Sequence, residues 1–422
     1  MPQHAWPLSR RSRWVSRRPR RKLLLAVMLS TAGVVACSTA PRRPAPIYEH
    51  DDPAPVGFSN AVRIVTLDQR SFEERSAEVL RRVQGASGGR PINVLALSGG
   101  GAGAAFGAGA LVGWTQAGTR PEFQLVTGVS AGALTAPFAF LGPDWDAQLT
   151  KSFSGRESEH LLRFHWPGLF FGSSLFRGKP LSDLVNEYAT EDMMRAIASE
   201  AGKGRMLLVA TTDLDNERTV IWDMGLIAMT GGDRALKLFR QVLIASASVP
   251  GIFPPVMIPV ETSGTIAEEM HVDGSTTASV FIAPEIASVL PTELHAFRGT
   301  NIYVLANGQY GAPTVTTPLR TAAIVKRGLE ASLHNSTRAA VLAALALAQQ
   351  NGMSFQVTAI PDDYTYNGVF DLKPERMRAL FNFAMGCAKN GALWTSAEGL
   401  LKRSAQAKLS RSGAPPKCPN PG

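Results

Sequence analysis

The sequence predicts a layered α/β fold in which a central, mostly parallel sheet is flanked by helices. Between residues 62 and 410, short apolar runs of strand length alternate with longer segments of helical pattern, which is the order typical of α/β proteins. One of these runs, residues 92–97, is nearly continuously apolar, as strands buried on both faces are. With 422 residues, 45% of them hydrophobic, the chain is long enough to bury a sizeable core.

The expected elements follow from the same patterns in chain order. Strands are expected at residues 92–97, 123–127, 206–211, 219–222, 270–275 and 301–305, the second stopping at Gly128 and the fifth ending in a turn. Helices are expected at residues 104–116, 134–141, 234–247, 321–350, 373–386 and 391–410. Within the fourth of these, residues 339–348 are almost wholly apolar, and a run of ten predicts a buried helix rather than a membrane span.

The first 36 residues have the layout of a secretory signal. Seven Arg and one Lys, without any acidic residue, precede a 14-residue apolar stretch at 23–36. As a helix this stretch rises about 21 Å, short of the roughly 30 Å of a hydrocarbon core. The length of this segment therefore favours a secretory signal over a permanent transmembrane helix.

The signal ends in Val34-Val35-Ala36-Cys37, which resembles a bacterial lipobox. The resemblance implies cleavage before Cys37 and lipid attachment to it, and several acyl chains anchor a protein stably in a membrane. Ser38, where lipoproteins retained in the inner membrane carry Asp, favours the outer membrane. We therefore expect a lipid-anchored protein of the bacterial cell envelope that faces the periplasm, followed by a Pro-rich tether over residues 37–60. The alternative is a cysteine that happens to end an ordinary signal.

The net charge does not call for a nucleic-acid partner. The formal charge is +9, but the eight basic residues of the signal account for all except +1 of it. The body of the protein is therefore close to neutral, and no polyanion-binding surface is required.

Export also gives the other two cysteines a role. Cys387 and Cys418 remain as an even pair once Cys37 is lipidated, and the periplasm permits disulfides. A bridge between them would close a loop of about 30 residues and pin the Pro-rich tail at 412–422. The alternative is two unrelated thiols.

The strongest chemical signal is Gly128-Val129-Ser130-Ala131-Gly132. It lies between an apolar strand and a helix-like run, the setting of a nucleophile elbow, where a serine is exposed on a sharp turn. The amino terminus of the following helix favours negative charge that develops there. Ser130 is therefore the candidate nucleophile.

A second signal, Ser98-Gly99-Gly100-Gly101-Ala102-Gly103, follows the strand at 92–97. Consecutive glycines let backbone amides point together and stabilise an oxyanion. The rival reading, a dinucleotide-binding loop, needs an acidic residue after the next strand. Glu122 is the only acidic residue between 102 and 140 and precedes that strand, and a Walker Gly-Lys-Ser/Thr is missing. A purely structural glycine loop remains an alternative.

A serine needs a base to become nucleophilic at neutral pH. Asp273, in Asp273-Gly274-Ser275 at the end of an expected strand, is one candidate, and partial burial would raise its basicity. From the residues alone, Asp273 is equally well a turn former. Five histidines follow Ser130 without a motif around them: His160, His165, His271, His295 and His334.

Taken together, these motifs resemble the patatin-like phospholipases, including bacterial patatin-like lipoproteins. The glycine loop, the serine motif about 30 residues later and the distant Asp-Gly occur in the family's order, and residues 126–142 and 245–256 look like blocks of bacterial members. The resemblance implies a patatin-like catalytic domain over 61–411, with its motif core at 90–310 and a helical C-terminal part. It also implies a Ser–Asp dyad.

Carried over, Ser130 is the nucleophile, Asp273 the base, and Gly99, Gly100 and Gly101 line the oxyanion hole. The resemblance thus implies an anchored lipid acyl hydrolase of phospholipase, lysophospholipase or esterase type, with a lipid or ester substrate and no cofactor. No Cys/His cluster has metal-ligand spacing. The family's glycine motif usually begins with Asp and has Arg two residues after its third Gly, where this chain has Ser98 and Gly103. This departure leaves open how the loop is braced.

Two other functions stay open at this point. One is a triad esterase in which Asp273 orients a histidine such as His295 or His334. The other is a lipoprotein scaffold or binding module that keeps the fold without turnover. An apolar and aromatic segment at 161–171 is either a lipid-facing cap or an ordinary buried loop.

Overall fold

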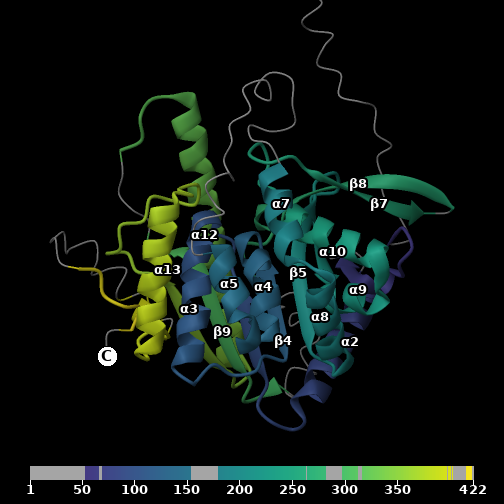
Figure 1. Cartoon of the computed structure of the whole chain (residues 1–422), viewed down its shortest axis with the longest axis horizontal. Coiled ribbons are helices and arrows are strands. Elements are labelled where there is room, and N and C mark those ends of the chain that lie inside the picture. Colours follow the sequence, from purple (N-terminus) through teal and green to yellow (C-terminus); the bar gives the residue numbers. More distant parts are fainter. Residues whose placement is uncertain are drawn as a thin grey trace, which may run out of the picture.

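The computed structural model describes residues 53–65, 69–153, 179–262, 264–281, 297–311, 316–396, 398–400, 402 and 415–420. They form a ten-stranded mixed sheet with helices on both faces (Figure 1). Several expected features lie outside the described residues. They are the expected signal at 1–36, Cys37, most of the expected tether, His160, His165, His295 and the segment at 161–171.

The parallel part of the sheet has five strands in the order β5-β4-β3-β9-β10. Their bounds are Met206–Asp213 (β5), Leu125–Val129 (β4), Asn93–Leu97 (β3), Asn301–Gln309 (β9) and Ser354–Ile360 (β10). Leu97 pairs with Gly128 on one side and with Leu305 on the other. The carboxyl ends of these strands therefore lie level at one edge of the sheet, where α/β proteins place their sites.

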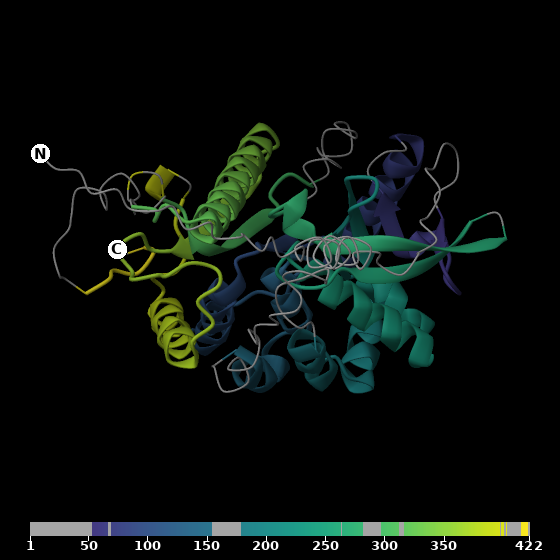
Figure 2. The same cartoon turned by 90° about the horizontal axis from the view of Figure 1, so that it is seen from above.

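The antiparallel part consists of β1 (Ala54–Pro55), β2 (Arg63–Val65), β6 (Arg218–Asp223), β7 (Val256–Thr262) and β8 (Thr265–Asp273). In this part, the sequence predicted β6 and the end of β8, at 219–222 and 270–275, but not the other three strands. β7 and β8 form a hairpin that projects from the body in Figures 1 and 2. Its charged Glu268 and Glu269 break up the apolar pattern by which strands are found. Ala54 and Pro55 pair with β7, so the last residues of the expected tether belong to the fold instead.

β5 has an unusual arrangement of partners. Met206 to Ala210 pair in parallel with β4, and Thr211 to Asp213 pair antiparallel with β8. β6 pairs with Leu208 to Asp213 and therefore occupies the opposite edge of β5. β4 and β8 thus share one edge of β5 and meet end to end, with Val129 opposite Ala210 and Asp273 opposite Thr211.

Alternate residues of the strands feed two cores, as the period of two requires. Leu95 and Leu97 face the larger core, and Val94 and Ala96 face the smaller one. The larger core is covered by α3 (Ala104–Gln116), α4 (Ala131–Leu141), α5 (Asp146–Phe153), α7 (Lys179–Tyr188), α8 (Glu191–Gly202), α9 (Met224–Thr230), α10 (Gly232–Ser246) and α13 (Pro374–Lys389). The smaller core is covered by α2 (Gln69–Ser87) and α12 (Thr321–Gln350), on the other side of the sheet in Figure 2.

Two expectations for the C-terminal helices were wrong. Residues 391–396 are not helical, because Thr395 forms a bridge with Val357 of β10; in the range 391–410 only 398–400 and 402 are described as helical. The apolar run at 339–348 is not a wholly buried helix, since only Val341, Ala344 and Ala348 are buried and Leu342 is 42% exposed. Among the described helices, none combines the length and apolar character needed to cross a membrane.

Candidate active site

Ser130 stands on a sharp turn between β4 and α4. Its φ of 55° and ψ of −128° are a conformation that L-residues rarely adopt. Its amide donates a 2.9 Å hydrogen bond to Ser246 Oγ on α10, which holds the turn in place. At Gly132, a Cβ atom would overlap the carbonyl oxygens of Leu97 and Ser98. The glycine therefore lets the start of α4 approach the end of β3.

Asp273 ends β8 and begins the short 3₁₀ turn Gly274–Thr276. Its side chain is 2% exposed, and Oδ1 accepts a 2.8 Å hydrogen bond from the Ser275 amide. Burial raises the pKa of Asp273 to about 6, although hydrogen bonds from Ser130 and Ser275 favour the ionised form. A carboxylate with this pKa is suited to accept a proton near neutral pH.

The two side chains are in direct contact. Ser130 Oγ donates to Asp273 Oδ2 at 2.6 Å. The contact follows from the end-to-end meeting of β4 and β8, because Ser130 comes directly after β4 and Asp273 is the last residue of β8.

Neither described histidine bonds to this pair. His271 bonds Glu269 and Thr211 instead, and His334 lies on α12. Deep burial of His271 between those partners makes it part of a structural network rather than of the Ser130 site.

The glycine loop differs in one respect from the expectation. The Gly99 amide donates to Ser279 O at 3.1 Å, so it is not an available donor for an oxyanion. Gly99 is needed for space instead, since a Cβ there would overlap Ser275 Oγ and lie 3.1 Å from Ser130 Cβ. Within the described part of the chain, the amides of Gly100, Gly101 and Ala131 have no acceptor.

The brace of the loop comes from residues that sequence reasoning missed. Ser98 Oγ accepts from the Asn307 amide at 2.9 Å, and Asn307 Nδ2 donates to Ser98 O at 2.8 Å. Tyr366 donates its hydroxyl to Gly100 O at 3.2 Å, and the Ala102 amide donates to Val369 O at 2.8 Å. Ser98 and these neighbours therefore hold the loop in place. They do so although Gly103 stands at the position where patatin-like phospholipases usually have Arg. The Asn307-Gly308 pair at the end of an expected strand was the one signal for this contact in the sequence.

A cavity of about 780 Å³ opens in front of Ser130 and Asp273. Apolar side chains line it, among them Leu134, Phe153, Leu181 and Met377 from four helices and Phe253 from the segment between α10 and β7. A polar stripe of α12 lines another part, with Lys326, Glu330, His334 and Arg338 spaced four residues apart on one helix face. A cavity of this size and character fits an acyl chain attached to a polar group. No group of three or more potential metal ligands occurs in the described residues.

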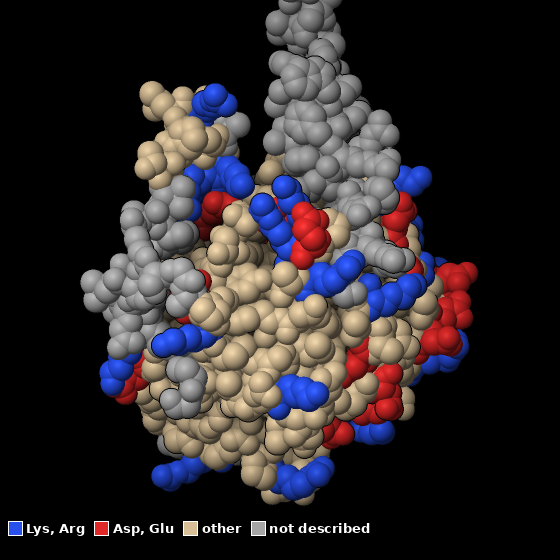
Figure 3. Space-filling view, turned by 60° about the vertical axis from the view of Figure 1, so that its left-hand side comes forward, with Lys and Arg blue, Asp and Glu red and all other residues tan. Residues whose placement is uncertain are grey.

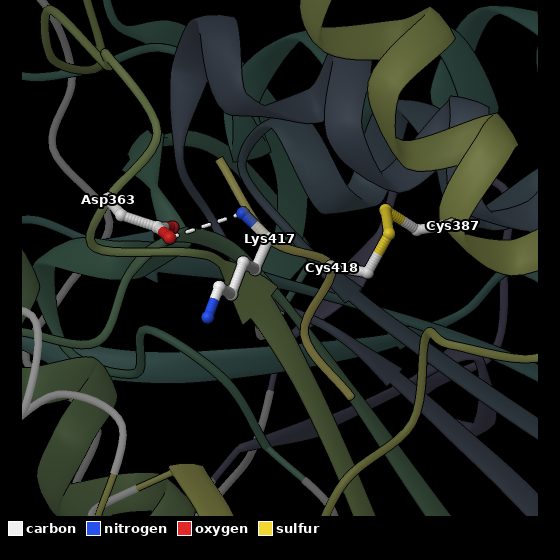
Figure 4. Close-up of a disulfide and its surroundings, with 4 residues drawn as sticks. All are labelled: Asp363, Cys387, Lys417 and Cys418. Atoms are coloured by element: carbon white, nitrogen blue, oxygen red, sulfur yellow. Dashed lines mark hydrogen bonds between the residues drawn. A yellow bond between two sulfur atoms is a disulfide. The ribbon is translucent and has the colours of Figure 1, made fainter. Parts of the chain in front are cut away.

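Cys387 and Cys418 form a disulfide with a Cα–Cα distance of 5.4 Å (Figure 4). Cys387 is on α13, whose neighbour α3 begins immediately after the glycine loop. Beside the bridge, the Lys417 amide donates to Asp363 Oδ2 at 3.1 Å. The C-terminal segment at 415–420 is thereby tied to the body.

The structure thus brings Ser130, Asp273 and the three glycines into one site, while Cys37 lies outside the described residues. A comparison with models of known protein families matches residues 95–286 to "Patatin-like phospholipase". The crystal structure of VipD from Legionella pneumophila is similar, with a TM-score of 0.34 and 13% sequence identity over 71% of this chain and 67% of VipD. No curated protein matches the sequence. The matched segment contains the glycine loop, Ser130 and Asp273, and this part of the chain is therefore similar to the patatin-like phospholipase domain.

Proposed function

We propose that this protein is a serine lipid acyl hydrolase that cleaves carboxylic esters of lipids with a Ser130–Asp273 dyad. The observation that carries the proposal is the 2.6 Å hydrogen bond from Ser130 Oγ to a buried carboxylate, at the wall of a largely apolar cavity. The family match supports the reaction class.

In the proposed reaction, Ser130 Oγ attacks the ester carbonyl carbon while its proton passes to Asp273 Oδ2. The amides of Gly100, Gly101 and Ala131 are the proposed donors to the oxyanion, each such donor being worth about 3–4 kcal/mol. When the ester C–O bond breaks, Asp273 returns the proton to the leaving alcohol. Water then attacks the acyl-enzyme, gives a proton to Asp273, and releases the fatty acid as Ser130 is reprotonated.

The test uses a short-chain p-nitrophenyl ester, a phospholipid and a serine-reactive fluorophosphonate. Ser130→Ala should lose both turnover and label, and Asp273→Asn should lose turnover by a factor of about 10³ or more, since general-base catalysis contributes about 10²–10⁴. His334→Ala is the matched control and should keep turnover of the short ester. A dead His334→Ala would favour the triad esterase, and a folded wild type with neither turnover nor label would favour a binding module.

We also propose that the protein is anchored in the bacterial outer membrane through lipidated Cys37 and faces the periplasm. The basic-then-apolar leader that ends at Cys37 supports this location. Metabolic labelling with an alkyne-tagged fatty acid should mark the wild type and not Cys37→Ser. Label in Cys37→Ser, or none in the wild type, would contradict the anchor without touching the proposed chemistry.

A further inference from the structure

The first turns of α12 stand away from the rest of the described fold. Figures 1 and 2 both show this helix extending past the helices and strands around it. Its buried positions, Val341, Ala344 and Ala348, all lie in the second half of Thr321–Gln350. Residues 318–327, which we call the α12 tip, therefore lack support from either core.

The α12 tip concentrates exposed apolar side chains. Leu319 is 95% exposed, Val325 64% and Ile324 49%. In the described residues only seven large apolar side chains are exposed, and these three lie within seven positions of one another. Scattered apolar residues at a surface are ordinary, but a group at one protruding end indicates a binding surface.

The charge beside these side chains is basic. Arg320 and Lys326 are exposed and Arg327 is partly exposed, while Glu330 is the one acidic residue on this part of the helix. Glu330 Oε1 lies 3.8 Å from Lys326 Nζ, and Glu330 Oε2 lies 3.9 Å from Arg327 Nη1. Because one carboxylate faces these two cations and Arg320 adds a third, the net charge of the tip is positive. In Figure 3 the protruding end at the upper left carries blue side chains next to tan ones. Apolar side chains flanked by Lys and Arg are typical of helices that bind the interface of anionic membranes.

The α12 tip is also continuous with the cavity in front of Ser130. Pro318, Ala323, Lys326 and Arg327 line that cavity, whereas Leu319, Ile324 and Val325 do not. The same helix end thus has one side toward the cavity and another toward solvent. A membrane bound at the tip would lie next to the cavity opening.

We propose that the α12 tip docks on an anionic phospholipid bilayer, with Leu319, Ile324 and Val325 entering the interface and Arg320 and Lys326 meeting the headgroups. A second copy of this chain is a poorer partner. Three aliphatic side chains at one tip fall far short of the roughly 800 Å² per partner that stable protein interfaces bury. Interfacial insertion needs only a few apolar groups with basic neighbours. Docking does not depend on the proposed hydrolysis.

The test places an environment-sensitive fluorophore at the tip of the full chain. Cys387 and Cys418 are joined, so in Cys37→Ser an added Val325→Cys supplies one free thiol for the dye NBD. With dioleoylphosphatidylglycerol vesicles the label should brighten several-fold and shift to the blue. With dioleoylphosphatidylcholine vesicles it should change little. The matched control is a label at Leu342→Cys, on the exposed face of the same helix far from the tip, which should stay in water.

Arg320→Gln should weaken the binding of phosphatidylglycerol vesicles, as reported by the label at position 325, by roughly fivefold. This is the contribution expected from one basic residue near an anionic surface. Adding Ser130→Ala should leave the response unchanged, so a failure of docking and a failure of hydrolysis are read separately. Vesicle binding without any change at position 325 would overturn the proposal, because another segment would then hold the membrane. A fluorescence change at position 325 that depends on protein concentration in the absence of vesicles would also overturn the proposal, because it would indicate self-association.

Discussion

Ser130 and Asp273 are 143 residues apart in the chain, yet Ser130 Oγ donates a 2.6 Å hydrogen bond to Asp273 Oδ2. β5 produces this contact by pairing β4 and β8 in opposite directions along one edge. The residue that follows one strand thereby meets the last residue of the other. The geometry depends on the registers of two strand pairs and not on a flexible loop, so the proposed nucleophile and its proposed base are held before a substrate arrives.

The pH dependence of activity should follow Asp273. Burial raises the pKa of this carboxyl to about 6, and only the ionised form accepts the serine proton. The value of kcat/KM for a short ester should therefore fall as the pH drops through about 6, with a tenfold loss per pH unit below it. His334→Ala should show the same fall of kcat/KM at acidic pH. A fall centred near the ordinary pKa of Asp, about 4, would contradict the role of burial.

Asp273→Asn should be inactive but more stable above pH 6. Because the folded-state pKa is raised from 3.8 to about 6, the folded protein binds more protons than the unfolded chain between those values. The free energy of unfolding of the wild type therefore falls, through this group, as the pH rises from about 4 to 6. A shift of about two units corresponds to roughly 3 kcal/mol as an upper limit.

Urea unfolding of both proteins at pH 4 and pH 8 measures this effect. The free energy of unfolding of Asp273→Asn should exceed that of the wild type by more at pH 8 than at pH 4. An equal difference in free energy at the two pH values would mean that the ionised carboxylate does not destabilise the fold.

Gly99→Ala should impair the site through space and not through a lost donor, since the Gly99 amide is already bonded to Ser279 O. The new Cβ would overlap Ser275 Oγ and press on Ser130 Cβ at 3.1 Å. We expect kcat to fall at least tenfold, as small displacements of reacting groups are costly.

Adding Ser275→Ala to Gly99→Ala removes the nearest clash and should restore part of kcat. Ser275→Ala alone keeps the amide that donates to Asp273 and is the control. If Ser275→Ala gives no rescue, the pressure on Ser130 itself is the larger effect.

The sequence predicted four of the five parallel strands because those segments are nearly continuously apolar, and it did not predict β10. β3, β4, β5 and β9 begin within two residues of their expected starts, and α3 has the expected bounds. Of the hairpin, only the end of β8 was predicted, because Glu268 and Glu269 interrupt the apolar pattern before it and β7 was not expected.

Long-range pairing explains the other misses. Nothing local marks Ser246 as a neighbour of the site, and Asn307 is marked only by the Asn-Gly pair that follows an expected strand. Their partners Ser130 and Ser98 are more than a hundred residues away in the chain. The hydrogen bond of the Gly99 amide could not be predicted either, because its acceptor, Ser279 O, is far away in the chain, after β8.

The strand that ends at Asp273 also contains a buried ion pair, and its loss should be costly. Arg63 of β2 bonds Glu269 at 2.6 Å and 3.1 Å, and both side chains are at most 2% exposed. Burial alone would raise the pKa of Glu269, but Arg63 and His271 outweigh it and hold that pKa at about 2. The pair therefore contributes stability above the ordinary pKa of Glu, and this contribution is lost as the pH falls toward 2.

Removal of Arg63 leaves the Glu269 carboxylate buried without its arginine, so Arg63→Met should lower the free energy of unfolding by about 3–5 kcal/mol. Arg63→Met with Glu269→Leu removes both charges and should recover much of that loss, because well-packed apolar pairs often replace buried ion pairs without penalty. Urea unfolding of the two variants at pH 7 measures the difference. Equal free energies of unfolding would show that another group compensates Glu269 when Arg63 is removed, and His271, 3.0 Å from Glu269 Oε2, is the neighbour placed to do so.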